Sequence, residues 1–165
     1  MVTTNSVNTY IVPTTNNEVT MPSQPAFLAY LSSTQTDKSG DGAVYDIIFD
    51  TEVFDQNNDY NTTTGVFTAP VTGRYYFAAQ VSWIDCTISV DVGLNVNTSN
   101  RIYAFYNVKS ASDHNIGIPG THLCDMDVGD TRYVYSIVNG EAADTCDLLG
   151  TSPNINTGFS MSLIC

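Results

Sequence analysis

The stretch GVFTAPVTGRYYF (residues 65–77) decides how this chain folds. Pro70 cannot donate a hydrogen bond to a strand ladder, so it should end the short strand before it. Gly73 is expected to take a positive φ in the turn that follows. The next strand, RYYFAAQVSW (residues 74–83), has apolar or small side chains on both faces. A strand of this kind should be covered on both sides.

Composition favours a single all-β domain. The chain has 165 residues, of which 42% are hydrophobic and 13% charged, and it contains 10 Tyr and 7 Phe. No stretch shows a convincing helical period of apolar residues. Strands are expected over residues 26–33, 43–54, 65–70 and 74–84, with several more behind them, and such spacing is typical of sandwiches and barrels. The segments 34–42 and 141–156 are expected to be loops.

Two strands lack a polar face that would suit exposure to solvent, which indicates contact with a second subunit. The strand that begins at Arg74 and the last strand of the chain carry apolar or small groups on both sides. A closed assembly of identical subunits is the simplest way to cover the side that does not meet the core. The residues predicted for this interface are Tyr75, Tyr76, Phe77, Ala79, Trp83, Phe159, Met161 and Leu163.

The first 24 residues differ from the rest. They are rich in Thr, Asn and Val, are interrupted by Pro13 and Pro22, and have too few large apolar groups for a core. We interpret residues 1–24 as an extended arm and residues 25–165 as the domain. Apolar side chains would let the arm lie along a neighbouring protein, and these are Val7, Tyr10, Ile11, Val12 and Val19.

The charge balance narrows the range of partners. Asp and Glu number 17 against 5 Lys and Arg, which gives a formal charge of −12. Such a surface repels nucleic acid and anionic lipid, and no apolar run is long enough to span a bilayer. Solubility is the simplest reason for the acid excess, and a divalent-cation site is the second.

Catalysis and zinc have little support in the sequence. The chain has 2 histidines, His114 and His122, and no nucleophile, zincin or phosphate-loop motif, so we expect no enzyme activity. His122 and Cys124 would share one side of a strand, but two ligands do not make a metal site. The four cysteines have no CxxC spacing, and whether they stay thiols or form a disulfide is open; they are Cys86, Cys124, Cys146 and Cys165.

One aromatic pattern resembles a known family. The spacing signature of the complement C1q globular domain is reproduced in order by Phe49, Asp55, Tyr60, Phe67, Gly73, Tyr75 and Phe77. The last aromatic of the signature is replaced by Ala79. Residues 25–165 therefore resemble the C1q and tumour necrosis factor superfamily. The resemblance implies a ten-stranded, two-sheet jelly-roll sandwich that assembles as a homotrimer.

Beyond the aromatic pattern, the amino-acid sequence itself is similar to C1q-like modules in structural proteins of tailed phages. This likeness implies a non-enzymatic virion surface protein, made in the host cytoplasm, without the leader and collagen stalk of animal relatives. The expected role is capsid decoration, with the arm bound to a shell protein. The alternative is the tip of a tail fibre that binds a host receptor or glycan, and a soluble ligand would require export.

Calcium is the one cofactor that the resemblance raises. Some family members hold it with loop oxygens near the trimer apex. Solvated turn aspartates remain the favoured interpretation, so no cofactor is expected. The calcium candidates are Asp37, Asp41, Asp55 and Asp59.

Overall fold

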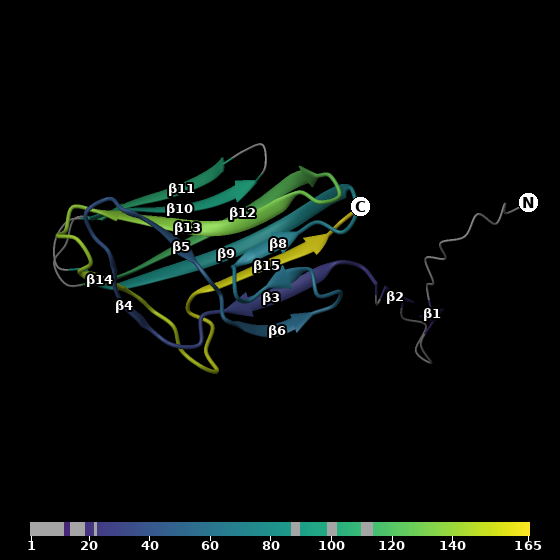
Figure 1. Cartoon of the computed structure of the whole chain (residues 1–165), viewed down its shortest axis with the longest axis horizontal. Helices are drawn as coiled ribbons and strands as arrows, with labels where there is room; N and C mark the ends of the chain where they lie inside the picture. The colour runs from purple at the N-terminus through teal and green to yellow at the C-terminus, as the bar shows by residue number, and fades with distance from the viewer. Residues whose placement is uncertain (1–11, 14–18, 22, 87–89, 99–101, 110–113) are drawn as a thin grey trace, which may run out of the picture.

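The chain folds into two packed β-sheets (Figure 1). The computed structural model describes residues 12–13, 19–21, 23–86, 90–98, 102–109 and 114–165. One sheet is seven-stranded, with the order β4-β14-β9-β15-β3-β6, and β12 pairs with the other side of β9. Its strands are β3 (Ala26–Tyr30), β4 (Gln35–Ser39), β6 (Thr51–Asp55), β9 (Gly73–Cys86), β12 (His114–Met126), β14 (Cys146–Leu148) and β15 (Gly158–Leu163).

A six-stranded sheet forms the second layer. Its order is β11-β10-β13-β8-β7, and β5 also pairs with β13. The strands of this sheet are β5 (Val44–Ile47), β7 (Tyr60–Asn61), β8 (Val66–Thr68), β10 (Val90–Thr98), β11 (Ile102–Lys109) and β13 (Thr131–Asn139). Near the N-terminus, β1 (Val12–Pro13) and β2 (Val19–Thr20) pair with each other. The predicted all-β, two-sheet jelly-roll sandwich is confirmed.

The long strand β9 is the centre of the seven-stranded sheet. It pairs with β12 along one side, and with β15 and then β14 along the other. Its alternate side chains Tyr75, Phe77 and Trp83 are 0% exposed and fill the space between the sheets. The indole N–H of Trp83 donates to Ser136 Oγ of β13 at 2.9 Å, which ties the two sheets together.

Stacked aromatic rings fill the other half of the core. The rings of Phe27 and Tyr60 stack with centroids 4.6 Å apart, and Phe159 meets Phe27 edge-on at 5.1 Å. The Tyr60 hydroxyl accepts from the Phe49 N–H and donates to the Phe49 carbonyl, both at 3.2 Å. Burial raises the pKa of this phenol, so it stays a neutral donor and acceptor.

Several expected elements have different bounds in the structure. The segment 43–54 is not one strand, since β5 lies in one sheet and β6 in the other. The segments expected as loops contain β4 and β14, so the described strands exceed the expected ten. Gly73 does not adopt a positive φ. Glycine is required there because a Cβ would lie 2.6 Å from Leu163 Cδ1 and 2.7 Å from the Cys165 oxygen.

Replacing Ser136 with alanine tests the link between the sheets. We expect Ser136→Ala to lower the free energy of unfolding by about 1–3 kcal/mol, because the buried indole N–H of Trp83 loses its acceptor. Urea denaturation followed by tryptophan fluorescence measures this loss. The exposed Ser33 provides the control, and Ser33→Ala should change stability by less than about 0.5 kcal/mol. Equal effects of the two substitutions would contradict the assigned role.

Candidate functional site

The side of the seven-stranded sheet that faces away from the core has no charged side chain at its centre. On β9, Tyr76 points to this side and is 41% exposed. Leu123 of β12 lies opposite Tyr76 and is 57% exposed, and Phe54 of β6 is 45% exposed. We call this side the outer face. Its two central cross-strand rows are Leu123, Tyr76, Ser162 and Ala26, and Thr121, Ala78, Ser160, Leu28 and Phe54.

Neither row of the outer face contains a charged side chain, although the whole chain has a formal charge of −12. The nearest charged pair in register is Arg74 and Asp125, which are exposed cross-strand neighbours two residues beyond Tyr76 and Leu123. A surface with exposed aromatic and leucine side chains and no charge at its centre has the composition of the core of a protein interface. The outer face is therefore the candidate assembly site.

The residues predicted for a subunit interface divide between the core and the surface. Tyr76 lies on the outer face, and Leu163 is half-buried against the core. The others are already buried within one chain, have no surface to lose to a second copy, and are corrected to core residues; they are Tyr75, Phe77, Ala79, Trp83, Phe159 and Met161. Because both faces of β9 carry apolar or small side chains, the face that points to the core could not be identified from the sequence alone.

Three outer-face residues are not among those predicted for the interface from the sequence. Leu28, Phe54 and Leu123 come from strands that had not been assigned to an interface. The signal that places them is strand register, since Leu123 lies opposite Tyr76, and Leu28 lies between Ser160 and Phe54. Register depends on tertiary pairing and is therefore weakly encoded in any one of these strands.

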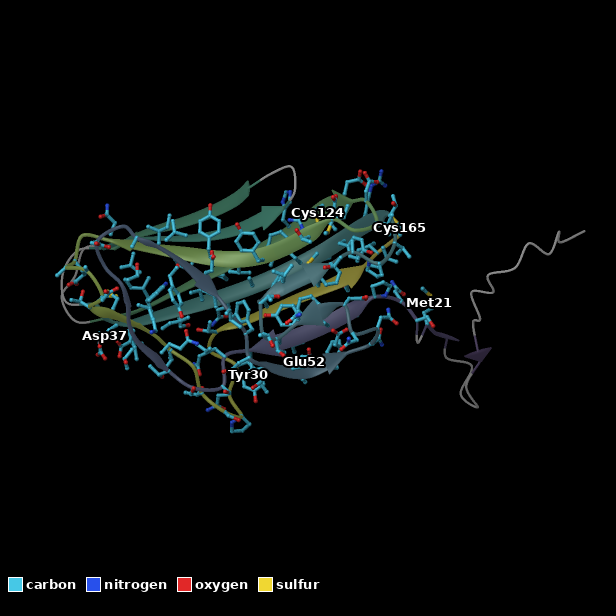
Figure 2. The ribbon with its side chains drawn as sticks, in the orientation of Figure 1. Met21, Tyr30, Asp37, Glu52, Cys124 and Cys165 are labelled. Atoms are coloured by element: carbon cyan, nitrogen blue, oxygen red, sulfur yellow. The ribbon has the colours of Figure 1, made fainter. Side chains whose placement is uncertain are left out.

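The domain begins and ends at the same end of the sandwich. The Gln24 side-chain amide donates to the Leu163 carbonyl, and the Leu163 N–H donates to the Pro25 carbonyl at 2.9 Å. The Arg74 N–H donates to the Cys165 carbonyl at 2.7 Å. Figure 2 shows Met21 and Cys165 at this end and Asp37 at the opposite end. A chain segment that precedes Met21 is thus joined to the domain at the Cys165 end.

The predicted arm lies mostly outside the described residues. Val7, Tyr10 and Ile11 are outside them, and the structure gives only the backbone pairing of Val12 in β1 and Val19 in β2. The prediction that these side chains bind a neighbouring protein therefore stays a prediction.

The structure does not bring the four calcium candidates together in one place. Asp37 lies in β4 at the end opposite Cys165, whereas Asp55 ends β6 beside the start of β3. Two of the carboxylates accept backbone hydrogen bonds within their own turns. Asp41 Oδ1 accepts the Ala43 N–H at 3.1 Å, and Asp55 Oδ2 accepts the Tyr60 N–H at 2.9 Å. Among the described residues, no three His, Cys, Asp or Glu side chains form a group that could hold a metal ion.

The predicted neighbours His122 and Cys124 also have different surroundings. His122 is exposed, whereas Cys124 is 4% exposed and donates its thiol to the Tyr75 carbonyl at 3.3 Å. The side chain of His114 lies outside the described residues. No helix in the described part of the chain is long and apolar enough to cross a membrane.

Comparison with known proteins assigns the fold to a family. A model of the C1q domain matches residues 26–149. The chain belongs to the C1q domain family. The globular domain of zebrafish complement 1qA protein is similar at 19% identity and a TM-score of 0.59, over 86% of this chain and 98% of that one.

Other solved structures share the fold of this C1q domain. Murine APRIL at pH 8.5 is 15% identical with a TM-score of 0.57, over 86% of this chain and 99% of that one. The tumour necrosis factor Eiger from S. frugiperda is 10% identical with a TM-score of 0.61, over 86% of this chain and 94% of that one. No curated protein sequence matches the chain. These likenesses establish the C1q and tumour necrosis factor fold.

Asp59 is the one calcium candidate with a buried carboxyl oxygen that has no hydrogen-bond partner. Burial, and then the nearby Asp55 carboxylate, raise the pKa of Asp59, and its Oδ2 is buried without a hydrogen-bond partner. The carboxyl group borders a hollow of about 800 Å³ beside β7 and β8, whose wall also includes Glu52, Thr62 and Pro70. A raised folded-state pKa means that the ionised form costs stability, and that protonation removes this cost.

The substitution Asp59→Asn should therefore stabilise the C1q domain at pH 7, because it removes a buried negative charge beside Asp55. The gain should shrink as the pH falls through the folded-state pKa of Asp59, where the wild-type carboxyl group is itself neutral. Thermal unfolding at a series of pH values measures both effects. Asp46→Asn, on the exposed side of β5, is the control. A loss of stability in Asp59→Asn at pH 7 would contradict the assigned environment.

Proposed function

We propose that this C1q domain is a non-enzymatic structural module that forms homotrimers. In the trimer, the outer faces of three seven-stranded sheets pack around a common axis. The observation that carries the proposal is the uncharged centre of the outer face, with exposed Tyr76, Leu123 and Phe54, in a chain of formal charge −12. Three acidic copies can approach one another best where each has no charge.

The arrangement of the outer face also suits rotational closure. A cyclic assembly covers the same patch on every copy and leaves no free patch for further growth. Tyr76 lies on β9, Leu123 lies on the adjacent strand β12, and Phe54 lies on β6, on the other side of β9. Each copy can therefore offer one flank of its outer face to each neighbour. The resemblance to the C1q and tumour necrosis factor superfamily supports three copies.

We also propose that the trimer is a virion surface protein, with capsid decoration as its role. The N-terminal arm, residues 1–24, would hold it to the shell. The position of Met21 at the same end of the domain as Cys165 supports this role, since an arm that starts there would leave the opposite end, with Asp37, free. The similarity to phage C1q-like modules supports the location. In the fibre-tip alternative, the free end would meet a host receptor or glycan.

Charged substitutions on the outer face test the trimer. The double variant Tyr76→Asp with Leu123→Asp should give a folded monomer near 17.9 kDa, whereas the wild type should have three times that mass. Carboxylates cannot be buried against one another around an axis without a large cost. Size-exclusion chromatography with light scattering at micromolar concentration measures the masses. The control is Val44→Asp, at a position that is 60% exposed on the six-stranded sheet, and it should remain trimeric.

A monomeric wild type would contradict the trimer, and so would a double variant that keeps the trimer mass. Circular dichroism separates these outcomes from misfolding, because the double variant should retain the strand spectrum of the wild type.

Deletion of residues 1–20 tests attachment. The deletion preserves the contacts of Gln24 and Pro25 with Leu163, so the trimer should stay intact. Virions assembled with the full chain should carry it, whereas virions assembled with the truncated chain should carry little or none. Quantitative mass spectrometry of purified virions measures the amount. Normal occupancy of the truncated trimer would contradict the anchoring role. Copy number separates the two virion roles, because decoration requires many copies over the shell and a fibre tip only a handful.

A further inference from the structure

Two cysteines meet where β9 and β14 pair, far from each other in the sequence. Cys86 is the last residue of β9, and Cys146 is the first residue of β14. The strands are in register at Asp147 with Ile84 and at Leu148 with Trp83. Both thiols are buried, at 1% and 0% exposure, and they are close enough for each to shift the pKa of the other. The Cys86 thiol donates to the Ile84 carbonyl at 3.7 Å. Neither cysteine is in a disulfide.

A bulge in β9 turns the two thiols toward each other. Regular alternation after the buried Trp83 would point Asp85 into the core and Cys86 away from it. Asp85 instead has a φ of 58° and is exposed, and Cys86 is buried in its place. The pairing with β12 shifts at the same point, since His114 lies opposite Cys86 and Ile116 opposite Trp83. A left-handed conformation at a non-glycine residue is uncommon, and here it places Cys86 beside Cys146.

The other two cysteines have different neighbours. Cys124 donates its thiol to the carbonyl of Tyr75 in the adjacent strand. Cys165 is exposed at the end of the sandwich where β9 begins, whereas Cys86 is where β9 ends. Among the four cysteines, all of which the structure describes, Cys86 and Cys146 are thus the pair that lies together.

We propose that Cys86 and Cys146 are a redox-responsive pair that forms an intrachain disulfide in an oxidising environment and remains two thiols in a reducing one. The oxidant is a small-molecule disulfide. A thiolate attacks one of its sulfurs, forms a mixed disulfide and expels one small thiol. The second cysteine thiolate attacks the cysteine sulfur of the mixed disulfide and expels the other small thiol, so that two thiols are oxidised and one disulfide is reduced.

The burial of both sulfurs controls how the pair reacts. Burial raises the pKa of each thiol, so few thiolates are present in the closed sheet. The pair should therefore oxidise slowly in the folded chain and faster when β14 detaches from β9. A disulfide formed in this way would lock β14 in place once the sheet closes.

The cross-link would act on the end of the sandwich that carries Asp37. β14 pairs with β4, with Cys146 opposite Ser39, and the Thr145 N–H donates to the Ser39 carbonyl at 3.0 Å. The Asp37 N–H donates to Asp147 Oδ1 at 2.8 Å. Fastening Cys146 to β9 would therefore also restrain β4 and the turn after it. The device would stiffen the free end of the domain without touching the outer face.

The test uses the full chain with Cys165→Ser, which removes intermolecular cross-links. The protein is equilibrated in a series of reduced and oxidised glutathione mixtures with mild urea, then alkylated and analysed by intact mass and non-reducing peptide mapping. We expect the oxidised protein to take up two fewer alkyl groups than the reduced protein, and to yield one cross-linked peptide containing Cys86 and Cys146. After urea is removed, the oxidised protein should unfold at a temperature higher by roughly 5 °C or more.

Matched variants separate the pair from other thiol chemistry. Cys86→Ser and Cys146→Ser should each abolish the mass change and the thermal shift, whereas Cys124→Ser should keep both. Asp85→Gly should cross-link like the parent, and Asp85→Val should lower the equilibrium constant for cross-linking about tenfold, because valine resists the left-handed conformation. The proposal is overturned if every remaining thiol stays free at all ratios, or if Cys124 enters the cross-link.

Discussion

Burial of one side of β9 is the constraint on which the rest of the structure depends. The strand is 14 residues long, and its side chains Tyr75, Phe77 and Trp83 point into the space between the sheets. A buried indole N–H needs an acceptor, so the contact of Trp83 with Ser136 fixes how β13 lies over β9. Once these positions belong to the core, Tyr76 has to face outward, and a side chain of a type usually found in the core is exposed on the surface.

The fold could be predicted because the recognised spacing describes a set of touching side chains. Phe49, Tyr60 and Phe67 are each at most 3% exposed and lie in one cluster with the rings of β9. Asp55 belongs to the pattern for a local reason, since its carboxylate caps the turn that leads into Tyr60. At the departure from the pattern, Ala79 lies opposite Phe159 and remains 5% exposed, so a small residue is accommodated within the same core.

The candidate site could not be predicted to the same extent, because it depends on register. A slip of one residue exchanges the two faces of a strand, and on β9 both faces are apolar or small. The sequence therefore indicated the strands that carry the outer face but not the outward positions, and Leu123 and Phe54 join it only through pairing. The short strands β4 and β14 were unpredictable for a related reason: β4 is polar, β14 has only 3 residues, and pairing with neighbouring strands orders both.

The alternation of side chains also explains how β9 can contribute to the core, to the outer face and to the cysteine pair. Along most of β9, alternation separates the core from the outer face, and any partner that covers Tyr76 leaves the core untouched. At Asp85 the phase changes by one residue, and Cys86 takes the inward position that Asp85 would have held. A carboxylate in that position would be buried beside Cys146 at a large cost in desolvation. The bulge thus avoids a buried charge and, as a direct consequence, brings two thiols together.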